Sequence, residues 1–206
     1  MSGGWLEWVL AYGALVCAGS VVKLTDDVLD AEFDRNRGRV TLASRLARAA
    51  LPYGLVLGLI AARLNLSLTI AVFFGAYAVG MVPTWRERLP TRVPAYVEIG
   101  AAMVVSILCV GWRLSIWGLA IMAVIDWLDD VVDASNDKLT GQRNLAVRFG
   151  VVETLLSILV ALCVAVLVNA ADTALVFAAV PVVTAVAELT TTRWWSDFGD
   201  DEGVGA

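Results

Sequence analysis

Half of the acidic residues of this chain are concentrated in two short segments: ten of the twenty Asp and Glu residues lie at 26–34 and 126–137. On an α-helix, which turns by about 100° per residue, the aspartates of each segment fall within an arc of about 100°, and only Glu32 points elsewhere. The first set is Asp26, Asp27, Asp30 and Asp34, and the second set is Asp126, Asp129, Asp130, Asp133 and Asp137. The spacing therefore predicts two helices that each carry a stripe of carboxylates.

A stripe of like charges near the end of a helix destabilises that helix. Carboxylates at positions i and i+4 repel each other, and near a helix C-terminus they also face the partial negative charge of the helix dipole. A solvated acidic surface is the simplest alternative, because runs of charge usually lie in water. Hard divalent cations with oxygen ligands offset such charge well. We therefore favour a functional Mg²⁺ site over a merely acidic surface.

The chain contains no histidine, which narrows the chemistry that it can perform. Ser-His-Asp catalysis, Cys-His catalysis and histidine-ligated zinc sites are all excluded. The three cysteines, Cys17, Cys109 and Cys163, each lie in an apolar run and form no CxxC pair. We interpret them as small buried hydrophobic residues. Any chemistry must then come from carboxylates, lysine and arginine, and hydroxyl groups.

The acidic stripes lie in a strongly apolar chain. Of its 206 residues, 59% are hydrophobic and 17% are charged, and the mean hydropathy is +0.77. A soluble domain usually has about 45–50% apolar and about 25% charged residues. This composition excludes disordered, nucleic-acid-binding and secreted disulfide-rich proteins. Seven apolar runs can be counted, roughly at 5–25, 47–62, 65–85, 95–112, 114–130, 151–171 and 173–190. We predict an all-α integral membrane bundle of about seven transmembrane helices over 1–195, followed by a short acidic cytosolic tail at 196–206.

Glycine residues inside the predicted spans indicate close packing of helices. Small residues let two helix backbones approach each other in lipid. We therefore expect helix–helix contacts at Gly13, Gly54, Gly58, Gly75, Gly80 and Gly100.

Basic residues are distributed unevenly between the two sides of such a bundle. With seven spans, one side collects thirteen of the fifteen basic residues, and the other has only Arg63 and Arg113. Because cytosolic loops are enriched in Lys and Arg, the N-terminus is predicted outside and the C-terminus in the cytosol of a multi-pass cell-membrane protein. Both acidic stripes then lie at the cytosolic ends of their helices. Arginine binds phosphate oxygens in a bidentate geometry, so this face predicts a Mg²⁺–diphosphate site.

Three motifs follow one another along the chain. The first motif is Asp26-Asp27-Val-Leu-Asp30-Ala-Glu-Phe-Asp34-Arg35-Asn36-Arg-Gly-Arg39. The second is the short basic segment Trp85-Arg86-Glu-Arg88-Leu-Pro. The third is Asp133-Ala-Ser-Asn-Asp137-Lys138-Leu-Thr-Gly141-Gln-Arg143-Asn144-Leu-Ala-Val-Arg148-Phe-Gly150. In order and spacing, over roughly residues 10–190, the chain resembles the UbiA superfamily of intramembrane prenyltransferases. The first acidic motif of that family contains NDxxDxxxD, which corresponds to the segment that starts at Asp26. Its second acidic motif ends in DxxxDxxxGxxTLxVRxG, which corresponds to the segment that starts at Asp133. Asp26 therefore stands in place of Asn, and Asn144 in place of Thr.

The resemblance implies a Mg²⁺-dependent prenyltransferase, which transfers alkyl groups other than methyl. Asp30, Asp34, Asp133 and Asp137 would ligate the metal ions, with Asp26, Asp27, Asp126, Asp129 and Asp130 in supporting roles. Arg39, Arg86, Arg88, Lys138 and Arg143 would bind the diphosphate, and the catalytic group would be Asp30, Asp133 and Arg143. The aromatic residues Trp127, Tyr53, Phe73, Phe74 and Tyr77 would line the channel of the prenyl tail or stabilise a carbocation, with core packing or an interface position as the alternative.

The implied partners are a prenyl diphosphate, a lipophilic acceptor and membrane lipid, without nucleic acid. The acceptor, the prenyl chain length and a homo-oligomeric state stay open. Family members commonly have more helices, so a partner subunit or lipid would replace a missing helix, or activity would be lost. Two alternatives keep the same ionisation step. If the prenyl chain captures its own carbocation, the protein is a membrane terpene cyclase, and if water captures it, the protein is a prenyl diphosphatase. A divalent-cation carrier or a non-catalytic membrane subunit is the alternative from another class, although almost entirely apolar mid-span positions disfavour a carrier.

Overall fold

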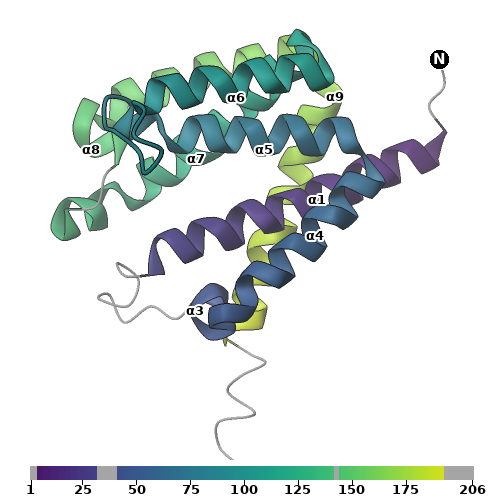
Figure 1. Ribbon diagram of the computed structural model, residues 1–206, viewed down its shortest axis with the longest axis horizontal. Coiled ribbons are helices and arrows are strands. Elements are labelled where there is room, and N and C mark those ends of the chain that lie inside the picture. Colours follow the sequence, from purple (N-terminus) through teal and green to yellow (C-terminus); the bar gives the residue numbers. More distant parts are fainter. Residues whose placement is uncertain (1–3, 32–40, 142–143, 193–206) are drawn as a thin grey trace, which may run out of the picture. The chain divides into compact units, whose positions relative to one another are not determined.

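The computed structural model describes residues 4–31, 41–141 and 144–192, and these residues form an all-α structure (Figure 1). The described helices are α1 (Trp5–Leu29), α3 (Leu42–Leu46), α4 (Ala50–Leu64), α5 (Leu66–Gly80), α6 (Ala95–Val110), α7 (Trp112–Thr140), α8 (Leu145–Phe149) and α9 (Val151–Thr192), with 3-10 helices η1 (Ala47–Ala49) and η2 (Val82–Thr84). The chain divides into two compact units, Met1–Leu64 with Leu175–Ala206 and Asn65–Ala174. The predicted all-α class is confirmed.

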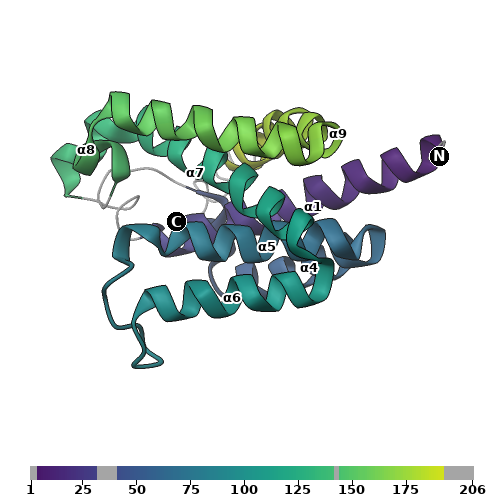
Figure 2. The ribbon, with the colours of Figure 1, turned by 90° about the horizontal axis from the view of Figure 1, so that it is seen from above.

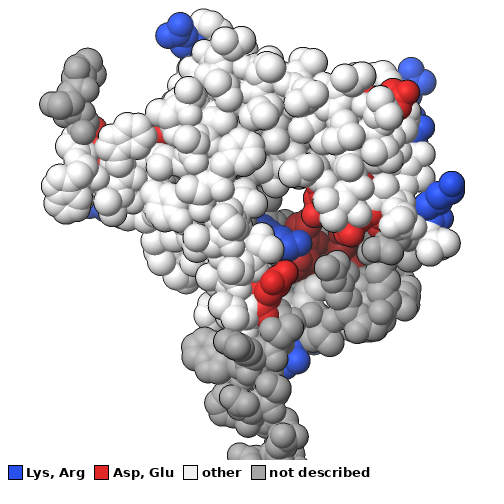
Figure 3. Space-filling view, turned by 180° about the vertical axis from the view of Figure 1, so that it is seen from behind, with Lys and Arg blue, Asp and Glu red and all other residues white. Residues whose placement is uncertain are grey.

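Four helical segments in the described part of the chain are long and apolar enough to cross a membrane: Trp5–Leu29, Leu42–Leu64, Leu66–Thr84 and Val151–Thr190. Large apolar side chains on them are open to the surroundings, and Leu59 and Leu167 are 71% and 85% exposed. Most of the described surface on the face in Figure 3 carries no charged group. Contiguous exposed apolar surface of this kind is rare on soluble monomers, so these helices indicate a multi-pass membrane protein.

In the unit Asn65–Ala174, the backbones of α5 and α7 are in direct contact. A Cβ atom added to Gly75 would lie 2.4 Å from the carbonyl oxygen of Gly118, and one added to Gly118 would lie 2.3 Å from the carbonyl oxygen of Ala71. Helix α5 also packs against α6, and the two run side by side in Figure 2. Trp117, beside Gly118 on α7, is completely buried. The approach of α5 and α7 therefore depends on residues without large side chains.

The glycine prediction is thus confirmed at Gly75 and fails at two other positions. A Cβ added to Gly13 would lie 3.3 Å from Leu64 Cδ1, which is a tight contact between α1 and α4. Among the described residues, no atom lies within 4 Å of a Cβ added to Gly80 or Gly100. The expectation of close packing at these two positions is wrong, because their faces of α5 and α6 are open.

In the other unit, α1 and α4 lie side by side (Figure 1). The short helix α3 packs against α1 through a buried cluster of Leu24, Ala43 and Ala50, with Leu46 beside it. Tyr12 donates a hydrogen bond from its hydroxyl to the carbonyl oxygen of Ala178 at 3.3 Å, which links α1 to the C-terminal part of α9. These contacts place α3 next to the acidic end of α1.

Helix α9 is interrupted at Asn169, whose φ of −156° and ψ of 83° are not helical. Asn169 Oδ1 accepts a hydrogen bond from the backbone N–H of Asp172 at 3.2 Å, which is the contact of a helix N-cap. Thr173 donates to the Asn169 carbonyl oxygen at 2.7 Å and accepts from Trp117 Nε1 at 3.0 Å. The segment 151–192 therefore consists of two helices, 151–168 and 170–192, that meet at Asn169.

We predict that Gly75→Ala destabilises the protein whereas Gly100→Ala does not. The first substitution forces two helix backbones apart, and such overpacking costs about 1–3 kcal/mol. The second puts the better helix former at an open position. Thermal unfolding of both variants in detergent measures the difference. Equal unfolding temperatures for the two variants would show that the α5–α7 contact does not limit stability.

Candidate functional site

The first acidic motif lies at the end of α1. Asp26 and Asp27 belong to the helix, which ends at Leu29. Asp30 is the C-cap residue, and its backbone N–H donates to the carbonyl oxygen of Asp26 at 2.9 Å. The predicted stripe therefore holds for Asp26 and Asp27 and reaches Asp30 at the helix end, while Asp34 lies outside the described residues.

A lysine of the same helix lies against this motif. Lys23 Nζ is 3.0 Å from Asp27 Oδ1 and 3.4 Å from Asp26 Oδ2. Positions three and four residues apart are neighbours on a helix surface, so one ammonium reaches both carboxylates. Asp27 is only 7% exposed, and a charge so well buried requires a partner of opposite charge or a hydrogen bond. Lys23 supplies that partner, a role that the sequence analysis did not assign to it.

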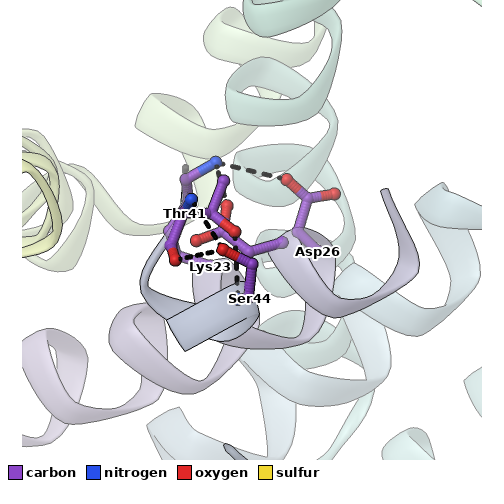
Figure 4. A network of polar contacts seen from close by, with 5 residues as sticks. Lys23, Asp26, Thr41 and Ser44 are labelled. Carbon is purple, nitrogen blue, oxygen red and sulfur yellow. Dashed lines mark hydrogen bonds and ion pairs between the residues drawn. The ribbon is translucent and has the colours of Figure 1, made fainter. Parts of the chain in front are cut away.

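A reciprocal pair of hydrogen bonds starts α3 beside these residues, as Figure 4 shows for Lys23, Asp26, Thr41 and Ser44. Ser44 N donates to Thr41 Oγ1 at 3.3 Å, and Thr41 N donates to Ser44 Oγ at 3.1 Å. These contacts satisfy backbone donors that the first turn of a helix leaves unpaired. Helix α3 packs against α1, and Arg39 lies outside the described residues.

The second acidic motif lies on a single continuous helix. Asp126, Asp129, Asp130, Asp133 and Asp137 all belong to α7, which extends to Thr140. Their exposure differs: Asp129 is exposed, Asp126, Asp130 and Asp133 are half-buried, and Asp137 is 5% exposed. The predicted helix is confirmed for this motif, and Asp137 is the most buried of its five aspartates.

A left-handed glycine ends α7 and reverses the chain. Gly141 has φ of 73° and ψ of 14°, a conformation that favours glycine, and its N–H donates to the Asp137 carbonyl oxygen at 2.9 Å. Asn144 then caps α8, because its Oδ1 accepts from Val147 N at 3.0 Å. The reversal brings the start of α8 back against α7.

The side chain of Asn144 also connects this turn to two aspartates of α7. Its Nδ2 donates to Asp137 Oδ2 at 2.8 Å and to the carbonyl oxygen of Asp130 at 2.6 Å. The Asp130 carboxylate accepts from Leu145 N at 3.0 Å through Oδ2. Asn144 is itself 5% exposed. The sequence prediction noted Asn144 only as a replacement for Thr, although an Asn just before a short apolar segment is an N-cap signal.

The predicted diphosphate ligands that are described are exposed. Arg86 and Arg88 lie in the loop between α5 and α6, and Lys138 lies near the end of α7. Arg86 stacks over the ring of Trp85 with its guanidinium carbon 4.6 Å from the ring centre. Arg143 lies outside the described residues.

Glu98 holds the basic loop against the helices. Its carboxylate accepts a hydrogen bond from Tyr77 at 2.6 Å and another from the Thr91 hydroxyl. Within the loop, Leu89 N donates to the Val93 carbonyl oxygen at 3.0 Å. Tyr77 is therefore part of the support of this loop, a role that the sequence did not indicate.

A small cavity adjoins the same loop in this unit. Its volume is about 290 Å³, and its lining consists of Pro83, Glu87, Gly141, Asn144, Leu145, Val147 and Arg148. Arg148 Nη1 donates to the carbonyl oxygen of Pro83 at 3.2 Å, which ties α8 to the segment before the loop. The cavity thus lies where the second acidic motif and the basic loop approach each other.

The other aromatic candidates occupy different environments. Tyr53 is 57% exposed, and Phe73 and Phe74 are half-buried. Trp127 Nε1 is buried and has no hydrogen-bond partner among the described residues. A buried indole N–H usually finds a hydrogen-bond acceptor. Among the described aromatic candidates, Trp127 is the one whose buried N–H lacks such an acceptor.

The donor chemistry of the two motifs fits Mg²⁺, because carboxylate oxygens are its preferred protein ligands. Within the described residues of either unit, however, no three Asp, Glu or Cys side chains group closely enough to hold a metal ion.

Comparison with known proteins gives no relative. No protein-family model, curated protein or solved structure matches the chain. The resemblance to the UbiA superfamily rests on the motifs alone.

We predict that Glu98→Ala increases tryptic cleavage after Arg88 and Arg92. Loss of both hydrogen bonds to this carboxylate should free the loop and raise the rate of cleavage. Thr91→Ser, which keeps a hydroxyl donor, is the matched control and should be cut like the original protein. Unchanged cleavage of Glu98→Ala would show that the loop is held by its own backbone contacts.

Proposed function

We propose that this protein is a Mg²⁺-dependent intramembrane prenyltransferase that ionises an isoprenyl diphosphate at its two acidic motifs and transfers the prenyl group to a lipophilic acceptor. The observation that carries the proposal is the continuous carboxylate stripe of α7 in an apolar, multi-pass chain. A second apolar helix, α1, also ends in carboxylates, at Asp26, Asp27 and Asp30. Acidic groups at the ends of apolar helices suit a polar headgroup with a buried hydrocarbon tail.

The proposal places both motifs on the cytosolic side of seven spans, with the N-terminus outside. Each of the seven predicted apolar runs contains helix, and the break at Asn169 separates the last two. A continuous helix of 42 residues would be about 63 Å long, against a hydrocarbon core of about 30 Å. Division at Asn169 gives two segments of membrane-spanning length, which supports seven spans.

In the proposed site, Asp30 and Asp133 are the central metal ligands, one from each motif. Bound Mg²⁺ would neutralise charge on the diphosphate oxygens and make the diphosphate a better leaving group. Arg39, Arg86, Arg88, Lys138 and Arg143 would bind the same oxygens and hold the departing anion.

The apolar helices would shelter the reactive end of the prenyl chain. The bond between the allylic carbon and the diphosphate oxygen breaks, and its electron pair leaves with the diphosphate. The carbocation is then captured by the acceptor, which loses a proton. Trp127 and the other aromatic residues would stabilise that cation through their ring faces, and exclusion of water favours transfer over hydrolysis.

The topology is tested by labelling single cysteines in a variant in which Cys17, Cys109 and Cys163 are replaced by Ala. We expect Arg113→Cys to react with a membrane-impermeant maleimide in intact cells and Arg88→Cys to react only after permeabilisation, because α6 lies between them. Both sites reacting from the same side would contradict a span at α6.

The activity is tested by diphosphate release from the purified protein in detergent, with C10 to C20 prenyl diphosphates and either Mg²⁺ or EDTA. We expect Mg²⁺-dependent release that falls by about 100-fold or more in Asp30→Ala and Asp133→Ala, because the leaving group loses its charge stabilisation. Glu7→Gln, which removes an exposed carboxylate of the first turn of α1, is the control and should retain full activity. Absence of release from every chain length, or equal release in the Asp variants, would contradict the proposal; product analysis with candidate acceptors separates transfer from cyclisation and hydrolysis.

A further inference from the structure

The C-terminal end of the second acidic stripe is already satisfied by donors from the chain itself. Asp137 Oδ2 accepts from Asn144 Nδ2 at 2.8 Å, and Asp130 Oδ2 accepts from Leu145 N at 3.0 Å. Asp137 and Asn144 are each only 5% exposed. Asp129, on the same helix, is exposed to the surroundings.

A metal ion at Asp137 Oδ2 would have to compete with Asn144 for this oxygen. A buried carboxylate that accepts a hydrogen bond has exchanged its water shell for protein donors, and loss of a donor leaves a buried charge unsatisfied. Rotation of the Asp137 carboxylate towards a cation would also release Asn144, which caps α8. Cation binding there would therefore be linked to loss of the hydrogen bond between Asn144 and Asp137.

We propose that Asn144 is a positioning residue that keeps Asp137 and Asp130 as structural anchors of the α7–α8 turn, so that Asp133, and not Asp137, serves as a ligand of Mg²⁺. The inference rests on the proposed function for the metal ion, but the anchoring contacts stand independently of it. It changes the role that the motif alone suggests for Asp137, which is that of a metal ligand.

The two halves of the Asn144 amide have separate tasks. Oδ1 accepts from Val147 N at 3.0 Å and caps α8, whereas Nδ2 donates to Asp137 Oδ2 and to the Asp130 carbonyl oxygen. An Asp at this position retains a good N-cap acceptor but has no donor for α7 and faces Asp137 with a like charge. Asn144→Asp therefore separates the anchoring contact from helix capping.

The test measures thermal unfolding of the full chain in detergent, first in EDTA and then over a range of Mg²⁺ concentrations. We expect Asp137→Ala, Asn144→Ala and Asn144→Asp to unfold at least about 2 °C below the original protein in EDTA, because a buried donor or acceptor loses its partner. Asp133→Ala should unfold in EDTA like the original protein. The Mg²⁺ concentration for half-maximal stabilisation should rise by at least about tenfold in Asp133→Ala and stay within about twofold in Asp137→Ala.

The double variant Asp137→Ala/Asn144→Ala adds a direct test of coupling. If the two residues act through one contact, the double variant should unfold at the temperature of the less stable single variant. Additive losses would contradict the anchoring contact. If Asp137→Ala does not fold, Asn144→Ala decides the question: a half-maximal Mg²⁺ concentration within about twofold of the original supports the proposal, and a rise of about tenfold or more overturns it.

The remaining outcomes separate this inference from the proposed function. Asp137→Ala with normal stability in EDTA and a tenfold weaker Mg²⁺ response would make Asp137 a metal ligand and overturn the inference. An original protein with no Mg²⁺-dependent stabilisation would contradict the proposed metal site alone. In that case the unfolding temperatures in EDTA still test the anchor: equal values for the original protein and Asn144→Asp would refute it.

Discussion

A carboxylate next to apolar helices must find a donor or an opposite charge, and the local structure around both acidic motifs follows from this constraint. Transfer of an unpaired charge out of water is very unfavourable. On α1, Lys23 Nζ lies 3.0 Å from the buried Asp27. On α7, Asn144 donates to the buried Asp137 at 2.8 Å. One motif is stabilised by an ion pair within its helix, and the other by a neutral side chain brought back by a turn.

The short helices α3 and α8 are the second consequence of the same constraint. Each follows an acidic motif, and each begins with a side chain that satisfies backbone donors, Thr41 in α3 and Asn144 in α8. The α8 start is bound directly to the aspartates of α7, whereas α3 packs on α1 through apolar residues. The end of α7 is thereby covered by polar contacts, and the end of α1 by apolar ones.

Periodicity and composition predicted the helices and the stripe on α7, because both depend on local spacing and on the excess of apolar residues. The contacts that end these elements depend on backbone geometry and were not predicted: the bend at Asp30, the reversal at Gly141 and the role of Asn144. Glycine illustrates the difference. The same residue type lies at a backbone contact at Gly75 and at an open face at Gly100, because the neighbouring helix, not the glycine, decides which face is covered. The function could be argued only from the motifs, and the identity of an acceptor depends on packing that spacing does not determine.

The crossing of α5 and α7 has a mechanical consequence. Gly75 and Gly118 meet with no side chain between them, and a shift of either helix by one turn would bring larger residues into the crossing. The two helices therefore have a single register and cannot ratchet past each other in small steps. The pair therefore behaves as one rigid element of its unit, so that any rearrangement of that unit must be accommodated by its other helices.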